Sequence, residues 1–419
     1  MENGLRSRMT GLVGTSLLLC AGAWPALGQA AGDAAASDAP ESVSLGRALS
    51  DGDLAVALRY RFEHVDDDAT AAVAAASTLR ASVGYRTLSY HGLSAHVEFS
   101  AVAEVGAGDR FNNAGAGANG NGITDRPVVA DPEMTRVNQL FATYVLGATS
   151  VSAGRLELAL DDQRFVGPVK WRQNYQTFAA ARVENRSIEH TTLSYAFLDR
   201  AYTITGGERP MASHLLNVAV ELPFGTAVGY GYLLDFGSEA DAGLSTGTVG
   251  LRFSGARPAG PLSVGYGAAY ARQRDRAANP DRVRADYFQV SASVGVPEVT
   301  VEVGYEVLGG SADEGRFTTP LATLHAFNGW ADRFLDTPAA GLEDLSVGLR
   351  GKSGRFTWQA LYHDFRAATG DARYGGEVDL LASYQAPWKQ ALGVKAAFYQ
   401  ADEHSTDTAK VWVWTAYSF

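Results

Sequence analysis

The sequence has almost no cysteine, and its one cysteine, Cys20, lies in the N-terminal stretch of the chain. Beyond that stretch, neither a disulfide framework nor a cysteine metal site can form. Apolar runs of about 18 residues are also missing after it, which excludes helical membrane spans. Basic residues are not in excess either: the net charge is −11, which argues against a nucleic-acid partner.

The N-terminal stretch, residues 1–30, has the features of a secretory signal peptide. Arg6 and Arg8 precede an apolar segment, and small residues lead to a cleavage site expected near Ala30. A lipoprotein signal is the alternative, because residues 17–20 read LLLC. However, a leucine precedes the cysteine where a small residue is expected.

Strand formers and turn formers are abundant in the sequence. Hydrophobic residues make up 46% of the chain and aromatics 10%, and there are 46 glycines. A chain of this length would ordinarily split into two or three soluble domains, at roughly 150 residues each. No linker is visible between such domains, which favours one large closed sheet.

The last residues, 411–419 (VWVWTAYSF), alternate like a lipid-facing strand and end on an aromatic residue. Val411, Val413, Tyr417 and Phe419 share one face, with Thr415 as its only polar member. This pattern is typical of the closing strand of an outer-membrane β-barrel.

Segments of about 10 residues with alternating polarity recur upstream of this strand. The first, Leu54–Glu63, has an apolar face opposite Arg59, Arg61 and Glu63. In water that face would need a partner sheet, whereas in lipid it needs none. Counting such segments predicts an all-β protein, a single transmembrane antiparallel barrel of about 18 strands.

Short and long connections alternate between the segments, as expected for periplasmic turns and extracellular loops in the bacterial outer membrane. The short turns are expected near residues 89–92, 147–149, 223–225, 296–298, 352–354 and 387–390. The long loops are expected at residues 106–135, 161–174, 205–213 and 309–341. The chain is thereby divided into residues 1–30 (signal peptide), 31–52 (periplasmic segment) and 53–419 (barrel).

Aromatic residues near strand ends are typical of interfacial girdles. The candidates are Tyr60, Phe62, Tyr144, Tyr230, Tyr232, Trp358, Tyr362, Tyr384 and Trp388. A soluble β-sandwich or propeller would also alternate, but its outer face would be polar and the terminal aromatic unexplained.

Charged residues of both signs fall on the inward face, where they can order and select passing ions. The predicted pore-lining residues are Arg59, Arg61, Arg80, Arg86, Arg155, Arg182, Arg252, Arg350, Lys395, Glu157 and Glu184. Ion pairing that holds the wall is the alternative role for each of them.

The connection 161–174 is long for a hairpin and could fold inward to narrow the pore. The residues of this predicted constriction loop are Asp161, Asp162, Arg164, Lys170, Trp171 and Arg172.

The stretch Gly154–Phe178, with the upstream Pro127–Tyr144, resembles the alginate-export-like family of outer-membrane porins. In that family a Gly-Arg strand, an Asp-x-Gln-Arg-Phe-x-Gly turn and a Trp-Arg-Gln-Asn step follow one another. The matching residues are Gly154, Arg155, Asp161, Gln163, Arg164, Phe165, Gly167, Trp171, Arg172, Gln173, Asn174 and Phe178. The resemblance implies a monomeric channel of about 18 strands whose lumenal Arg and Lys guide an anionic substrate. Polyuronate export is the activity of its best-known member.

Motifs of soluble enzymes occur in contexts that do not suit them. Residues 115–122 contain G-x-G-x-x-G within a Gly/Asn-rich loop, without the strand and helix that a dinucleotide site needs. Residues 243–247 match G-x-S-x-G around Ser245, but no helix follows. The histidines show no zinc-site spacing. We therefore expect no catalytic residues, no cofactor and no metal.

The sequence thus predicts a non-enzymatic channel for passive passage of small or polymeric anionic solutes. Its expected partners are outer-membrane lipid, an anionic solute or polyuronate, and periplasmic export components. The alternatives are an uptake porin for other small solutes, an outer-membrane hydrolase with its site at the barrel rim, and an adhesin or structural barrel with a plugged lumen. Charge reversal at Arg155 and Arg172 is expected to shift ion selectivity toward cations.

Overall fold

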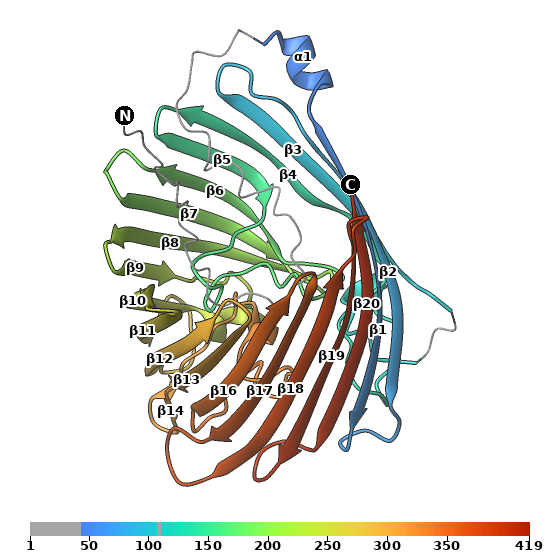
Figure 1. The fold of residues 1–419 in the computed structure, drawn as a ribbon, viewed down its shortest axis with the longest axis vertical. Coiled ribbons are helices and arrows are strands. Elements are labelled where there is room, and N and C mark those ends of the chain that lie inside the picture. The colour runs from blue at the N-terminus through green and yellow to red at the C-terminus, as the bar shows by residue number, and fades with distance from the viewer. Residues whose placement is uncertain (1–42, 107–109) are drawn as a thin grey trace, which may run out of the picture.

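The computed structural model describes residues 43–106 and 110–419, and the expected signal peptide lies outside them. The described chain forms an 18-stranded antiparallel sheet whose first and last strands pair, so that the sheet closes into a barrel (Figure 1). The predicted fold class is confirmed. The barrel strands are β1 (Asp53–Asp67), β2 (Ala74–Arg86), β3 (Leu93–Glu104), β4 (Met134–Leu146), β5 (Thr149–Leu156), β6 (Thr177–Asn185), β7 (Thr191–Tyr202), β8 (Glu208–Leu222), β9 (Gly225–Leu233), β10 (Thr246–Ala259), β11 (Leu262–Asp275), β12 (Arg284–Val296), β13 (Val299–Leu308), β16 (Leu342–Ser353), β17 (Phe356–Arg366), β18 (Arg373–Gln385), β19 (Gln390–Ala401) and β20 (Thr408–Ser418).

The closing seam joins β1 to β20, which lie side by side in Figure 1. The Phe419 amide donates a hydrogen bond to the Val56 carbonyl at 3.0 Å. In β20, Val413 is exposed on the outer face, whereas Trp412 and Trp414 are buried inside. The alternation predicted for this segment is therefore confirmed, and its inner face supplies two tryptophans to the lumen.

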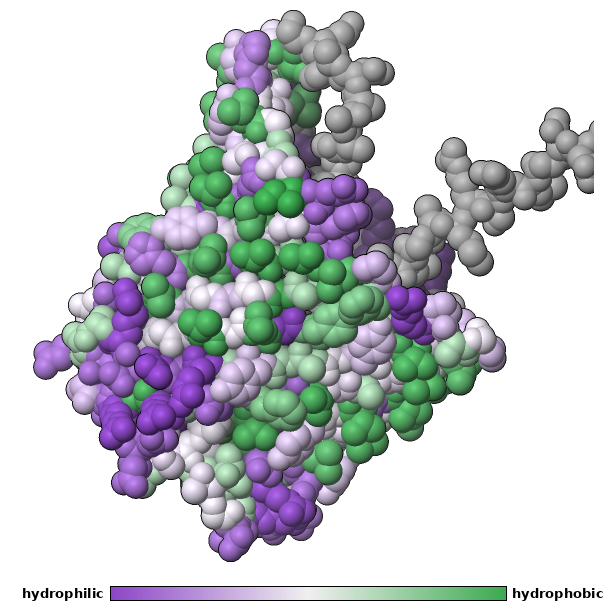
Figure 2. Space-filling view, turned by 90° about the vertical axis from the view of Figure 1, so that its left-hand side faces the viewer, coloured by the Kyte–Doolittle hydropathy of each residue, from purple (hydrophilic) through white to green (hydrophobic). Residues whose placement is uncertain are grey.

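Large apolar side chains are exposed over the outer wall of the barrel. Figure 2 shows such side chains spread across one face, with hydrophilic side chains gathered toward its lower left. This surface suits lipid rather than water, since soluble proteins rarely expose wide apolar patches. Its members include Leu54, Leu58, Val83, Leu140, Leu216, Val249, Leu251, Val303, Leu349, Val394 and Val413.

The connections fall into two sets at opposite ends of the barrel. The short-turn end, where β1 begins and β20 ends, has connections at residues 87–92, 147–148, 186–190, 223–224, 260–261, 297–298, 354–355 and 386–389. The long-loop end has them at residues 68–73, 105–133, 157–176, 203–207, 234–245, 276–283, 309–341, 367–372 and 402–407.

One predicted loop is wrong in part, because residues 208–213 belong to β8. A shift of register opposite Leu198 and Arg200 accommodates Pro210, which has no amide hydrogen to donate to the ladder.

The remaining elements are short. Helix α1 (Leu45–Ser50) precedes the barrel at the short-turn end (Figure 1), where the Tyr85 hydroxyl donates to the Leu49 carbonyl at 2.7 Å. Strands β14 (Gly310–Ser311) and β15 (Gly315–Arg316) form a small hairpin, and single helical turns occur at η2 (Gly117–Asn119), η3 (Glu239–Leu244) and η4 (Leu324–Ala326). No helix in the described part of the chain is long and apolar enough to cross a membrane.

Candidate functional site: the plugged lumen

Two segments from the long-loop end fold into the barrel and touch each other there. We call them together the plug: residues 157–176, after β5, and residues 317–334, before β16. Val166 and Leu321, one from each segment, form a parallel bridge, and the Gly167 amide donates to the Leu321 carbonyl at 2.9 Å. Both side chains are buried. The two segments therefore form one body inside the ring of strands.

The first plug segment crosses the lumen from one wall to the other. Near its start, Asp162 accepts two hydrogen bonds from Arg252 of β10, at 2.5 and 2.7 Å. Near its end, the Arg172 guanidinium donates to Glu63 of β1 at 3.0 Å. Strand β10 lies about half-way around the ring from β1, so the segment spans the pore.

Charges of the plug are matched by charges of the wall. Burial alone would raise the pKa of Asp162, but its hydrogen bonds from Arg252 hold that pKa below the usual value. Burial would lower the pKa of Arg164, but Glu306 of β13, at 2.7 Å, raises it. Both groups are therefore ionised across the ordinary pH range.

Lys395 of β19 holds the plug through an aromatic cage. Its ammonium lies 3.7 Å from the ring centre of Trp330, 4.5 Å from that of Trp171 and 5.4 Å from that of Trp412. Cation–π attraction is strongest over tryptophan and in desolvated places, and Lys395 is fully buried. This Trp–Lys cage joins both plug segments to the wall of the barrel.

A buried ionic network continues from the cage toward β1. Asp332 of the plug accepts hydrogen bonds from Arg172 at 3.1 Å, from Lys410 at 2.8 Å and from His325 at 2.6 Å. Burial would raise the pKa of Asp332, but the surrounding cations hold it well below its usual value. Nearby, Arg61 pairs with Asp131 of the 105–133 loop.

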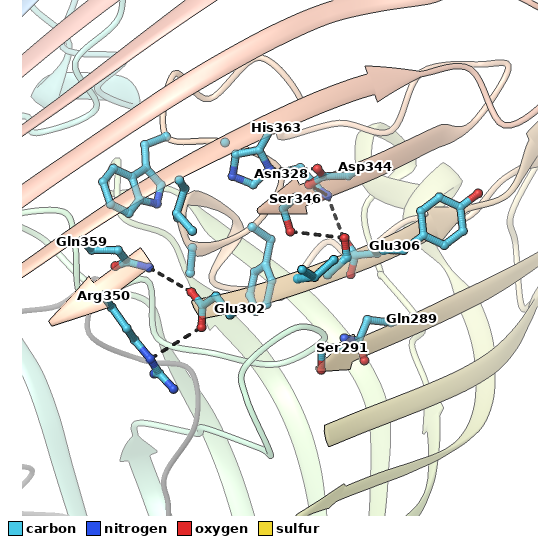
Figure 3. A pocket seen from close by; sticks show the side chains of 18 of the residues that line it. Gln289, Ser291, Glu302, Glu306, Asn328, Asp344, Ser346, Arg350, Gln359 and His363 are labelled. Carbon is cyan, nitrogen blue, oxygen red and sulfur yellow. Dashed lines mark hydrogen bonds and ion pairs between the residues drawn. The ribbon is translucent and has the colours of Figure 1, made fainter. Parts of the chain in front are cut away.

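A cavity of about 180 Å³ lies beside the second plug segment, against β12, β13, β16 and β17. Figure 3 shows Glu302 at one side of it, between Arg350 and Gln359, with Glu306 farther in. The Arg350 Nε lies 3.6 Å from a Glu302 carboxylate oxygen, and the Gln359 amide donates to the other at 3.5 Å. Phe327 of the plug and Leu361 of β17 supply apolar wall.

The predicted pore-lining residues divide by what they contact. Five of them contact the plug, and four others line the wall elsewhere. In contact are Arg59, Arg61, Arg80, Arg252 and Lys395; on the wall are Arg86, Arg182, Glu184 and Arg350.

The predicted constriction loop maps onto the first plug segment. Asp161 accepts a hydrogen bond from Asn217 of β8 at 3.0 Å, and Lys170 pairs with Glu157 at 2.6 Å within the segment itself. Asp162, Arg164, Trp171 and Arg172 make the wall and cage contacts described above.

Arg155 is not placed in the lumen, contrary to the prediction. It is in register with Leu140, an exposed apolar side chain, and its neighbour Leu156 points inward. Its guanidinium lies 3.7 Å from the ring centre of Tyr202 at the long-loop end. Successive residues of a strand face opposite sides, so Arg155 belongs to the outer face.

Tyr230 and Tyr232 are also misplaced by the prediction of a girdle. Both are buried in the lumen, where Phe165 of the plug packs on them with ring centres 5.4 and 6.2 Å away. Gly229 and Gly231 occupy the outer face of β9 in their place. Exposed aromatics of the outer wall do include Tyr144, Tyr362, Tyr384 and Trp388.

The second plug segment is the main feature that the sequence reasoning missed. A signal for it exists: residues 317–334 contain Phe317, Trp330 and Phe334, which are costly to expose in a loop. Ser245, from the G-x-S-x-G motif, is fully buried and accepts a hydrogen bond from the Phe236 amide at 2.9 Å, so its hydroxyl braces the 234–245 loop.

Comparisons with known proteins agree with this architecture. Residues 51–196 match the family model described as alginate export. No curated protein matches the chain. Among solved structures, OpdK of Pseudomonas aeruginosa with vanillate is similar at a TM-score of 0.72 and 11% identity, covering 88% of this chain and 98% of that one. P. aeruginosa OccK9 (OpdG) is similar at a TM-score of 0.71 and 14% identity, covering 89% of this chain and 99% of that one.

Acinetobacter baumannii OccAB3 gives a TM-score of 0.69 at 14% identity, covering 88% of this chain and all of that one. At such identities the likeness speaks for the fold, and the family match over 51–196 covers the strands and plug segment that carry the sequence resemblance. Residues 51–196 are therefore similar to the alginate-export family, and the barrel as a whole has the fold of the outer-membrane porins.

Proposed function

We propose that the protein is a passive channel for small anionic solutes, and that the plug sets its constriction. The observation that carries the proposal is the charge of the inner wall near the plug. The strands from β1 to β6 turn five arginines inward, Arg59, Arg61, Arg80, Arg86 and Arg182, against three glutamates that pair with them, Glu63, Glu98 and Glu184, so basic charge is in excess on this part of the wall. Such a wall attracts anions into the pore.

The plug favours small solutes over polymers. Its first segment reaches from β10 to β1 and is held by buried ion pairs at both ends. A polyuronate chain could pass only if the plug were displaced. The short-turn end, where α1 precedes β1, faces the periplasm by the usual topology of outer-membrane barrels.

The test is a planar bilayer measurement on the mature protein, residues 31–419. Under a salt gradient we expect the sign of the reversal potential to indicate anion selectivity. When an oligouronate is added, we expect it to block the channel current without itself crossing the membrane. Cation selectivity would overturn the guiding role of the arginines. A silent bilayer would favour the adhesin or the hydrolase instead.

A further inference from the structure

The cavity beside the plug has one charged side chain with donors to spare. Arg350 makes no hydrogen bond within the described residues, and its nearest acid, Glu302, is 3.6 Å from its Nε. Good charge-assisted hydrogen bonds are about 2.7–2.9 Å long. The Arg350 side chain is 28% exposed and that of Glu302 22%. This ion pair is therefore loose and open to the cavity.

The inner part of the cavity is, by contrast, saturated. Glu306 accepts hydrogen bonds from Arg164 at 2.7 Å, from the Tyr287 hydroxyl at 2.6 Å and from Asn328 at 2.7 Å. A carboxylate oxygen of Asp344 is hydrogen-bonded to His363 Nδ1 at 2.8 Å. A bound solute can gain little from these groups, whereas Arg350 and Glu302 form the loosest ion pair of the cavity and can still contact a solute (Figure 3).

The position of this pair in its strands sets the side from which it is reached. Glu302 lies near the start of β13 and Arg350 near the end of β16, both close to the short-turn end. Toward the long-loop end the cavity is covered by plug residues 326–330. The cavity is therefore entered from the short-turn end while the plug is in place.

We propose that this cavity is a subsite for small carboxylates whose neighbouring carbon carries a hydroxyl group. The carboxylate accepts two parallel hydrogen bonds from the terminal nitrogens of Arg350, in the geometry that a guanidinium favours. The hydroxyl donates to Glu302, and the rest of the solute packs on Phe327 and Leu361. The inference rests on the proposed channel function, since it names the solute class of that channel.

Mandelate and phenylacetate are matched probes, because they differ only in the hydroxyl group. Each is added to one side of a planar bilayer containing single channels. The orientation of each channel is read from an Ala148→Cys variant modified by a membrane-impermeant thiol reagent, since residues 43–419 contain no cysteine and Ala148 lies in a short turn.

We expect mandelate to block from the short-turn side at a concentration about tenfold lower than phenylacetate, the factor for one hydrogen bond to a charged group. Glu302→Met should make the two probes equal, and Arg350→Met should abolish block by both. Arg350→Lys keeps the positive charge but cannot form the two parallel hydrogen bonds of a guanidinium, so the probes should block this variant only weakly. The control is Arg276→Met, in an exposed loop at the long-loop end. Both probes should block this variant as they block the parent.

Conductance recorded before the probe is added shows that each variant has folded. Equal block from both sides, equal block by both probes in the parent, or unchanged block in both Arg350 variants would overturn the subsite while leaving the channel. Absence of any conductance in the parent would instead overturn the proposed function, and the subsite with it.

Discussion

The indole of Trp171 stacks on the imidazole of His325, with ring centres 5.1 Å apart and planes inclined by 6°. The two residues come from different long loops, and each also packs edge-on against Trp412 of β20. The stack therefore couples the two plug segments to each other and to the closing strand. Displacing one segment must disturb the other.

Replacing Trp171 by alanine should loosen the plug. The side chain is 5% exposed and fills the space between His325, Trp412 and Trp414, and truncating a buried tryptophan costs about 3–5 kcal/mol. We expect larger and noisier single-channel conductance. Trp388→Ala, at a turn where the ring is 61% exposed, is the control and should conduct like the parent. A folded Trp171→Ala barrel with parental conductance would contradict the role of the stack.

The hydrogen bonds of His325 fix its protonation state. Its Nδ1–H donates to Asp332 at 2.6 Å, and its Nε2 accepts from the Lys395 ammonium at 2.7 Å, which requires a neutral ring. Burial is the main cause that lowers the pKa of His325, to about 3; Asp332 opposes it and Lys395 adds to it. With the plug displaced into water, that pKa returns to about 6.5.

Acidification should therefore favour the displaced plug. Above pH 6.5 the ring is neutral in both states, so the balance does not depend on pH. From about pH 6.5 down to about 3 only the displaced state binds the proton, and each pH unit shifts the balance by up to about 1.4 kcal/mol. We expect more frequent open events at pH 4.5 than at pH 7. The same pH response in His325→Gln would refute this assignment.

The alternation of polarity along the sequence predicted the strands of the barrel wall but not which side chains fill the lumen. The alternation of residues 411–419 gave the closing strand correctly, because lipid on one side imposes a period of two. In β9 the same reasoning misplaced Tyr230 and Tyr232, since tyrosine and glycine both suit either face. Arg155 was misplaced by one residue of register, which inverts the face of a side chain.

The plug contacts could not be read from the sequence for a different reason. Trp171 meets His325 and Trp412, which are far away in the chain, and no local periodicity links them. The only signal in the sequence was the composition of the 309–341 loop. It contains Trp330 and Phe334, large apolar residues that are stabilised by burial. The partner surface inside the barrel becomes known only once the ring of strands is closed.

Removing the charge of Arg61 should destabilise the whole barrel. Arg61 is 2% exposed and pairs with Asp131 and Glu63, which are themselves buried. Arg61→Met leaves these carboxylates without that partner, and breaking a buried ion pair costs about 3–5 kcal/mol. The expected result is a lower thermal unfolding temperature in detergent. Adding Asp131→Asn should recover part of the loss; no recovery would show that the pair is not the cause.

Charge reversal at Arg182 should change ion selectivity without disturbing the plug, unlike charge reversal at Arg172. Arg182 faces the lumen from β6 with a side chain 31% exposed, whereas Arg172 is locked to Glu63 and Asp332. Arg182→Glu should shift the reversal potential toward cations with the barrel intact, while Arg172→Glu should disrupt the plug. Arg257→Glu, exposed at the short-turn end of β10, serves as the control. An unmoved reversal potential in Arg182→Glu would exclude it as a guide for anions.

Gly393 permits the packing of the closing strand against the plug. A β-carbon at this position would lie 2.0 Å from the Trp414 ring, which crosses over Gly393 and meets Trp171 with ring centres 5.5 Å apart. Gly393→Ala should therefore push the Trp414 ring toward the plug, at a cost of about 1–3 kcal/mol for overpacking. The measurement is the thermal unfolding temperature together with single-channel conductance.

The control for this change is Gly231→Ala in β9, where a β-carbon would meet nothing within 4 Å. A second test is a double-mutant cycle with Trp414→Ala, because the two residues are paired across β19 and β20. If the clash with the ring is the cause, Gly393→Ala should cost little once the ring is gone. An equal cost with and without Trp414 would instead assign the effect to the strand backbone of β19, and the plug would then be independent of Gly393.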